Sequence, residues 1–135
     1  MADYNKHNDL PAVALSGNKT LAAVDQGTVQ DVTTDAVVLS LPAVAAGLVF
    51  IVRNKALIPA ATPGAVSGKR VGFTIVPNGV ETVSGFGITP AAGKGLQFVK
   101  LLSVPGDYVK LSAGAGTWNI EEIATQNTGA VIRIP

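Results

Sequence analysis

Short runs of β-branched and aliphatic residues, separated by glycine and proline, most constrain the fold of this 135-residue chain. From residue 20 onward, such runs recur at a spacing of roughly 8–12 residues, and several alternate apolar with polar positions. This spacing is typical of an all-β sandwich or barrel. The expected strands span residues 28–32, 37–41, 48–52, 71–76, 96–102, 108–111, 117–120 and 130–134.

The pattern predicts an all-β fold, namely a single antiparallel β-sandwich or β-barrel-like domain with an extended N-terminal arm. Residues 1–19 form the expected arm, because they contain Pro11 and Gly17 and show little periodicity. Residues 20–135 form the expected β-rich domain. The arm would become ordered where another surface receives it, and a flexible tail is the alternative. Deleting residues 1–18 is therefore expected to leave a folded domain that binds its partner less well.

An uncharged run over residues 36–52 is close to the minimum length of a transmembrane helix. Pro42 and Gly47 interrupt the run, and its ends are rich in β-branched residues. The same pattern, P-A-x-x-x-G-L-x-F, occurs over residues 42–50 and 90–98, where the second copy includes Lys94. We therefore expect the run to form a strand, a connection and a second strand, with no membrane partner. The repeated pattern can be explained either by a duplication or by two uses of the same loop pattern.

Charge and residue usage exclude several classes of function. Only 14% of the residues are charged, against about 25% in ordinary soluble domains, and the net charge is +1. This balance argues against a nucleic-acid binder. The chain has no Cys and one His, which excludes disulfide frameworks, cysteine zinc sites and thiol catalysis. Asp25, Asp31 and Asp35 lack the alternate spacing of a calcium loop. We expect no cofactor, no metal and no enzymatic activity.

Four residues are candidates for an interface: Tyr4, His7 and Leu10 in the arm, and Trp118 in the domain. His7 has no second His with which to form a ligand set or a catalytic pair, so a solvated side chain is its simplest interpretation. A lone Trp in a β-protein is usually a core residue or an interface anchor. Stacking on a sugar is the alternative role for Trp118.

Two segments resemble recurring strand pairs of small structural proteins in tailed phages. The first is Val38-Leu-Ser-Leu-Pro42 followed by residues 46–54, and the second is Pro105-Gly-Asp-Tyr-Val-Lys-Leu111 followed by residues 116–120. Such sequences are similar to capsid decoration (cement) proteins, and to adapter and fibre domains of the same β-rich type. Under half of the chain carries the resemblance, and none of it is a catalytic signature.

The resemblance implies a virion structural protein that binds the outer surface of a phage head and stabilises contacts between capsid subunits. Its partners would be the major capsid protein and further copies of itself, with a trimer expected before a dimer. It would be made in the host cytoplasm and act at the capsid surface. The alternatives are a tail, baseplate or fibre module, and a β-domain that binds a host glycan through Trp118 or Tyr108.

Overall fold

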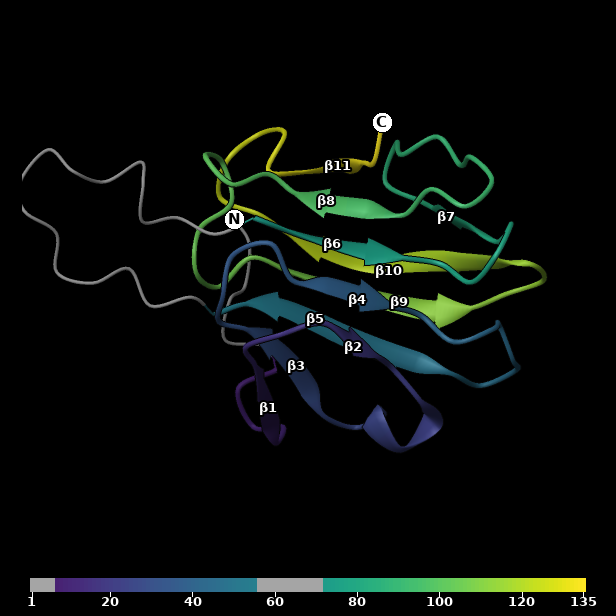
Figure 1. Cartoon of the computed structure of the whole chain (residues 1–135), viewed down its shortest axis with the longest axis horizontal. Helices are drawn as coiled ribbons and strands as arrows, with labels where there is room; N and C mark the ends of the chain where they lie inside the picture. Colours follow the sequence, from purple (N-terminus) through teal and green to yellow (C-terminus); the bar gives the residue numbers. More distant parts are fainter. Residues whose placement is uncertain (1–6, 56–71) are drawn as a thin grey trace, which may run out of the picture.

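The computed structural model describes residues 7–55 and 72–135, which form two β-sheets (Figure 1). Sheet A has six strands in the order β1-β3-β5-β9-β10-β7, and sheet B has five in the order β11-β8-β6-β4-β2. A single turn of 3₁₀ helix, η1 (Ala23–Asp25), precedes β3. The strand bounds are β1 Ala12–Leu15, β2 Lys19–Thr20, β3 Val29–Val32, β4 Val38–Ser40, β5 Val49–Asn54, β6 Phe73–Val76, β7 Thr82–Ser84, β8 Leu96–Phe98, β9 Tyr108–Ala113, β10 Thr117–Ala124 and β11 Val131–Arg133.

Both sheets are mixed, so the expectation of a single antiparallel sandwich or barrel is wrong. In sheet A the pairs β1–β3, β3–β5 and β7–β10 are parallel, whereas β5–β9 and β9–β10 are antiparallel. In sheet B the pairs β2–β4 and β4–β6 are parallel, and β6–β8 and β8–β11 are antiparallel. The strand-rich content is as expected, and the pairing is not.

The parallel pairs arise because the chain alternates between the two sheets. From β1 to β9, consecutive described strands lie in alternate sheets. The chain therefore crosses to the other sheet, forms a strand there and crosses back before it adds the next strand to the first sheet. Two such crossings restore the original direction, which places β1, β3 and β5 side by side and parallel. Among the described strands, only β9 and β10 are consecutive in the chain and paired, through the turn at 114–116.

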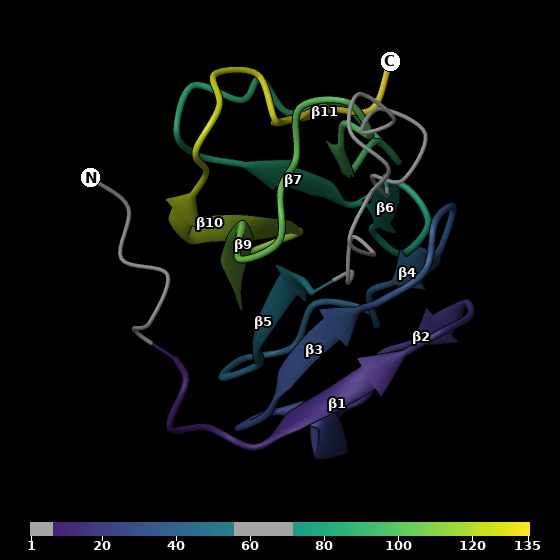
Figure 2. The ribbon, with the colours of Figure 1, turned by 90° about the vertical axis from the view of Figure 1, so that its left-hand side faces the viewer.

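Part of the predicted arm belongs to the domain. Residues 12–15 form β1, which pairs with β3 at the edge of sheet A, and residues 19–20 form β2 at the edge of sheet B. Leu15 is 6% exposed and belongs to the core between the sheets. Figure 2 shows β1 and β2 at one end of the two sheets, and β7 and β11 at the other.

The core lies between the sheets and follows the strand alternation. Phe73 and Ile75 of β6 point into the core, and the alternate positions of the strand are half-buried. The buried residues of the flanking strands β4 and β8 also point into the core. Phe73 stacks on Phe98 of β8, with ring centroids 4.2 Å apart. A second, smaller cluster lies on the opposite face of sheet A. Its buried members are Val29, Ile51, Tyr108 and Ala124.

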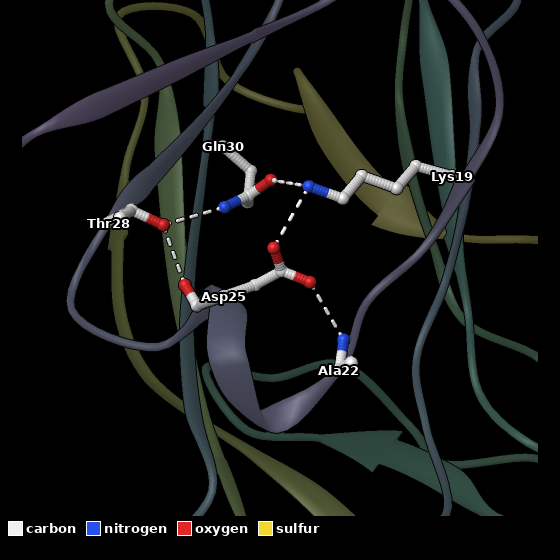
Figure 3. Close-up of polar contacts among 5 residues, drawn as sticks. All are labelled: Lys19, Ala22, Asp25, Thr28 and Gln30. Carbon is white, nitrogen blue, oxygen red and sulfur yellow. Dashed lines mark hydrogen bonds and ion pairs between the residues drawn. The ribbon is translucent and has the colours of Figure 1, made fainter.

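A polar network links the two sheets at the end where β1 and β2 lie (Figure 3). The Lys19 ammonium of β2 donates to Asp25 Oδ1 at 3.0 Å and to Gln30 Oε1 of β3 at 3.1 Å. Asp25 Oδ2 accepts the Ala22 N–H at 2.8 Å, and Thr28 Oγ1 joins Gln30 to the Asp25 carbonyl. Gln30 is fully buried. The network therefore satisfies a buried amide and holds η1 against both sheets.

The uncharged run over residues 36–52 forms β4 in sheet B and β5 in sheet A, which confirms the expected strand, connection and strand. Gly47 lies in the connection with a positive φ of 86°. No helix within residues 7–55 and 72–135 is long and apolar enough to cross a membrane.

Candidate binding surfaces

The outer face of sheet A, which points away from the core, is covered in part by the N-terminal segment. Leu10 packs against the cluster formed by Val29, Ile51, Tyr108 and Ala124. The His7 ring meets the Tyr108 ring edge-on, with centroids 5.1 Å apart and an interplanar angle of 85°. The described part of the segment thus lies against its own sheet, and does not project from it.

Glu122 joins three polar groups beneath this segment. Its Oε2 lies 3.3 Å from His7 Nε2 and accepts the Tyr108 hydroxyl at 3.1 Å, while Oε1 lies 3.8 Å from Lys110 Nζ. A register shift between Ile120 and Glu122 in β10 places Glu122 opposite Lys110 of β9. The carboxylate therefore serves as an acceptor that fixes the His7 ring on the sheet.

A buried ion pair anchors the same segment. Asp31 of β3 and Arg53 of β5 are paired in the strand register, and each is 6% exposed. Arg53 donates through Nε to Asp31 Oδ1 at 2.7 Å and through Nη2 to Oδ2 at 3.0 Å. Its Nη1 donates to Asn8 Oδ1 at 2.8 Å. Bidentate pairing of this kind is directional, so it positions Asn8 as well as neutralising two buried charges.

The candidate interface residues therefore separate into three groups. His7 and Leu10 meet in one place, as members of a contact within the chain. Tyr4 lies outside the described residues. Trp118 is fully buried beside Phe50, with ring centroids 5.5 Å apart, and is a core residue. Its Nε1 has no hydrogen-bond partner in the described part of the protein.

Burial also removes the basis for sugar stacking. A ring that stacks on a sugar needs a free face, and Trp118 is 0% exposed while Tyr108 is 4% exposed. Both rings are instead packed against other residues: Trp118 lies between the sheets, and Tyr108 lies against His7. In these positions neither ring offers a free face for stacking on a sugar.

The outer face of sheet B has the opposite character, because its outward positions are all uncharged. These positions alternate with the buried core residues of the same strands. They are Thr20, Val38, Ser40, Thr74, Val76, Gln97 and Ile132. A groove of about 370 Å³ lies over this face, and its lining includes the ion pair of Asp35 with Lys100, 2.7 Å long.

A second groove, of about 460 Å³, lies beside β11. It is lined by residues 86–89 and 131–133. Phe86 is 61% exposed and adopts a positive φ of 51° at the tip of a turn between Gly85 and Ile88. The Arg133 guanidinium donates to the Thr89 carbonyl at 3.4 Å, which ties β11 to this turn.

The described residues do not include a group of three or more His, Asp or Glu side chains placed to hold a metal ion. Comparison of the chain with protein-family models, with curated proteins and with solved structures found no match. Sequence reasoning missed the uncharged face of sheet B, because that face exists only once five strands from across the chain are paired. The alternation within residues 73–76 was the available signal, since it marks Thr74 and Val76 as outward.

Proposed function

We propose that this chain is a virion structural protein of a tailed phage, which binds the outer surface of the head and stabilises contacts between capsid subunits. The observation that supports this most is the outer face of sheet B, whose outward residues carry no charge across five strands. The resemblance of residues 38–54 and 105–120 to decoration proteins supports the same role. The major capsid protein is the proposed partner.

An uncharged face, made mostly of small and β-branched side chains, suits docking onto another protein. No ion has to leave water when this face docks, its apolar area contributes when it is buried, and its hydroxyl and amide groups can form hydrogen bonds with the partner. A ligand that binds only the assembled shell stabilises it by mass action, and many symmetric copies make a modest affinity per copy sufficient. Such binding should depend only weakly on salt, in contrast to binding to nucleic acid.

Co-sedimentation with the phage's own capsids tests the proposal. We expect the wild-type chain to bind, with similar affinity at low and high salt. Val38→Lys places an unpaired charge on the sheet B face, where Val38 is 36% exposed, and should weaken binding by about tenfold or more. Val80→Lys changes the same residue type in the turn after β6, where the side chain is 80% exposed, and is the matched control.

Failure of the wild-type chain to bind capsids would overturn the proposal, as would loss of most of the affinity in high salt. Equal binding by Val38→Lys and Val80→Lys would show that the sheet B face is not the docking surface. Electron microscopy of phage particles with the labelled protein separates the head from the tail, and label confined to the tail would establish the alternative of a tail or baseplate module.

A further inference from the structure

The edge strand β1 differs from the other three sheet edges. β1 (Ala12–Leu15) has four residues, all uncharged, whereas β2, β7 and β11 have two or three. β2 begins with Lys19, and β11 ends with Arg133, which is tied to the neighbouring turn. Short strands and charges are the usual means of keeping a sheet edge unpaired, and β1 has neither a charge nor a proline within it.

The unpaired side of β1 presents a defined set of backbone groups. Val29 N–H donates to the Pro11 carbonyl and Thr33 N–H to the Leu15 carbonyl, so residues 11, 13 and 15 face β3. By the alternation of a strand, the N–H and C=O groups of Ala12 and Ala14 point the other way. No described residue bonds them. Figure 2 shows β1 at the margin of sheet A, with β3 on its inner side.

We propose that β1 pairs antiparallel with β1 of a second copy of this chain, about a two-fold axis that passes beside Val13. In this register Ala12 faces the partner's Ala14, and each pair exchanges two backbone hydrogen bonds, four in all. Val13 then faces the partner's Val13 as a non-hydrogen-bonded pair. Sheet A becomes a continuous twelve-stranded sheet across the dimer.

The second copy is favoured over an unrelated strand because the segment is complementary to itself. A two-fold contact brings each residue close to its own counterpart or to a neighbour of it, so a charge within the segment would meet a like charge. Residues 10–18 contain no charge, and Lys19, the next residue, is held by Asp25 and Gln30. The alanines on either side of Val13 present no bulk on the opposite face.

The dimer should be weak in free solution. A four-residue strand pair is smaller than a standard interface of about 1,600 Å², so we expect substantial dimer only at concentrations of about 100 µM or more. Covalent trapping makes the pairing measurable below that concentration. The chain contains no Cys, so a single introduced thiol reports on one position alone.

Val13→Cys tests the register directly. Non-hydrogen-bonded residues that face each other in antiparallel strands have Cα atoms about 4.5 Å apart, within the range that a disulfide spans. Under mild oxidation we expect Val13→Cys to form a covalent dimer at least tenfold faster than Val80→Cys. Ala12→Cys should also be slow, because in this register its thiol faces Ala14 of the partner and lies diagonal to the partner's own thiol.

A charge pair provides the second test. Val13→Lys and Val13→Glu should each be monomeric at the concentration where the wild type dimerises, and an equimolar mixture should restore the dimer as a heterodimer. Buried-Trp fluorescence from Trp118 checks that each variant is folded. Equal crosslinking of Val13→Cys and Val80→Cys, or a mixture that stays monomeric, would overturn the pairing. Capsid binding by Val38→Lys is a separate measurement, so failure of one proposal does not imply failure of the other.

Discussion

At the scale of single residues, the most consequential contact is the buried pair of Asp31 and Arg53. Two charges that are each 6% exposed are tolerated only because they satisfy each other and Asn8. Taking two ions out of water is costly, and mutual attraction only about offsets that cost. The pair therefore adds specificity of register between β3 and β5 more than net stability.

A double-mutant cycle in urea tests this interpretation. Asp31→Leu leaves the Arg53 guanidinium buried without its carboxylate and should lower the free energy of unfolding by about 3–5 kcal/mol. The double variant Asp31→Leu with Arg53→Met removes both charges and should return to within about 1 kcal/mol of the wild type. Additive losses from the two single changes would contradict the prediction.

Asp25 is expected to make stability depend on pH. Burial alone would raise the pKa of this carboxyl, but the Ala22 N–H and the Lys19 ammonium together hold the pKa below its usual 3.8. Because the folded state prefers the ionised form, the stabilisation is present above pH 3.8 and is lost as pH falls through the lower, folded-state pKa.

Urea unfolding of the wild type and Asp25→Asn at about pH 6 and about pH 3 measures the effect. We expect Asp25→Asn to cost about 1–2 kcal/mol at the higher pH and less at the lower one. The pKa of Asp35 is also lowered, by the Gly72 N–H and Lys100, so some acid sensitivity should persist in the variant. A difference between the two proteins that does not change with pH would contradict this role of Asp25.

At the residue scale, the sequence indicated which residues lie at a contact better than it indicated their partners. The sequence predicts His7 and Leu10 as interface residues, and both lie at a contact, but with their own sheet. The partner of His7 is Glu122, which lies 115 positions away in the chain. No local sequence pattern indicates this contact, because the position of Glu122 on the sheet depends on the register shift in β10.

At the scale of elements, most strands were predictable and their neighbours were not; β1, β2 and β7 were not expected from the sequence. Each of the eight expected strands contains or overlaps an observed one, because alternation and β-branching are local properties. Pairing depends on which sheet each connection enters, which local sequence does not encode. The two copies of P-A-x-x-x-G-L-x-F show this, since one leads into β5 of sheet A and the other into β8 of sheet B.

The two glycines of that repeated pattern also have different roles. Gly47 occupies a left-handed conformation in an open turn, with a φ of 86°. Gly95 lies so close to the Ile75 carbonyl that a Cβ atom there would overlap it. The same letters thus satisfy a conformational need at one site and a packing need at the other.

The N-terminal strands lead to a prediction that reverses the one from sequence. Deleting residues 1–18 removes β1 and the core residue Leu15, and exposes the edge of β3, so we expect a strongly destabilised or aggregating protein. Deleting residues 1–6 keeps every described contact of His7, Asn8 and Leu10 and should lower the urea midpoint by much less than deleting residues 1–18. Equal midpoints for the two truncations would show that β1 does not stabilise the domain.

At the scale of the whole molecule, the two outer faces differ in charge and in what covers them. The outer face of sheet A carries Asp31, Arg53, Lys110 and Glu122, and the chain's own N-terminal segment contacts two of them, Glu122 through His7 and Arg53 through Asn8. The outward strand positions of sheet B carry no charge, and the ion pair of Asp35 with Lys100 lines the groove over this face. The low charge noted in the composition is therefore not spread evenly, and it leaves one uncharged sheet face for the proposed partner.

The alternation of the chain between sheets also has a consequence for how the protein is made. Except for β9 and β10, neighbouring strands of one sheet are separated in sequence by at least one strand of the other, so neither sheet can be completed from a contiguous segment. Such non-local pairing raises contact order and slows folding. On the ribosome, sheet B cannot close until β11, its last strand in chain order, has emerged. Any assembly that uses the completed sheet B must therefore wait for the synthesis of β11.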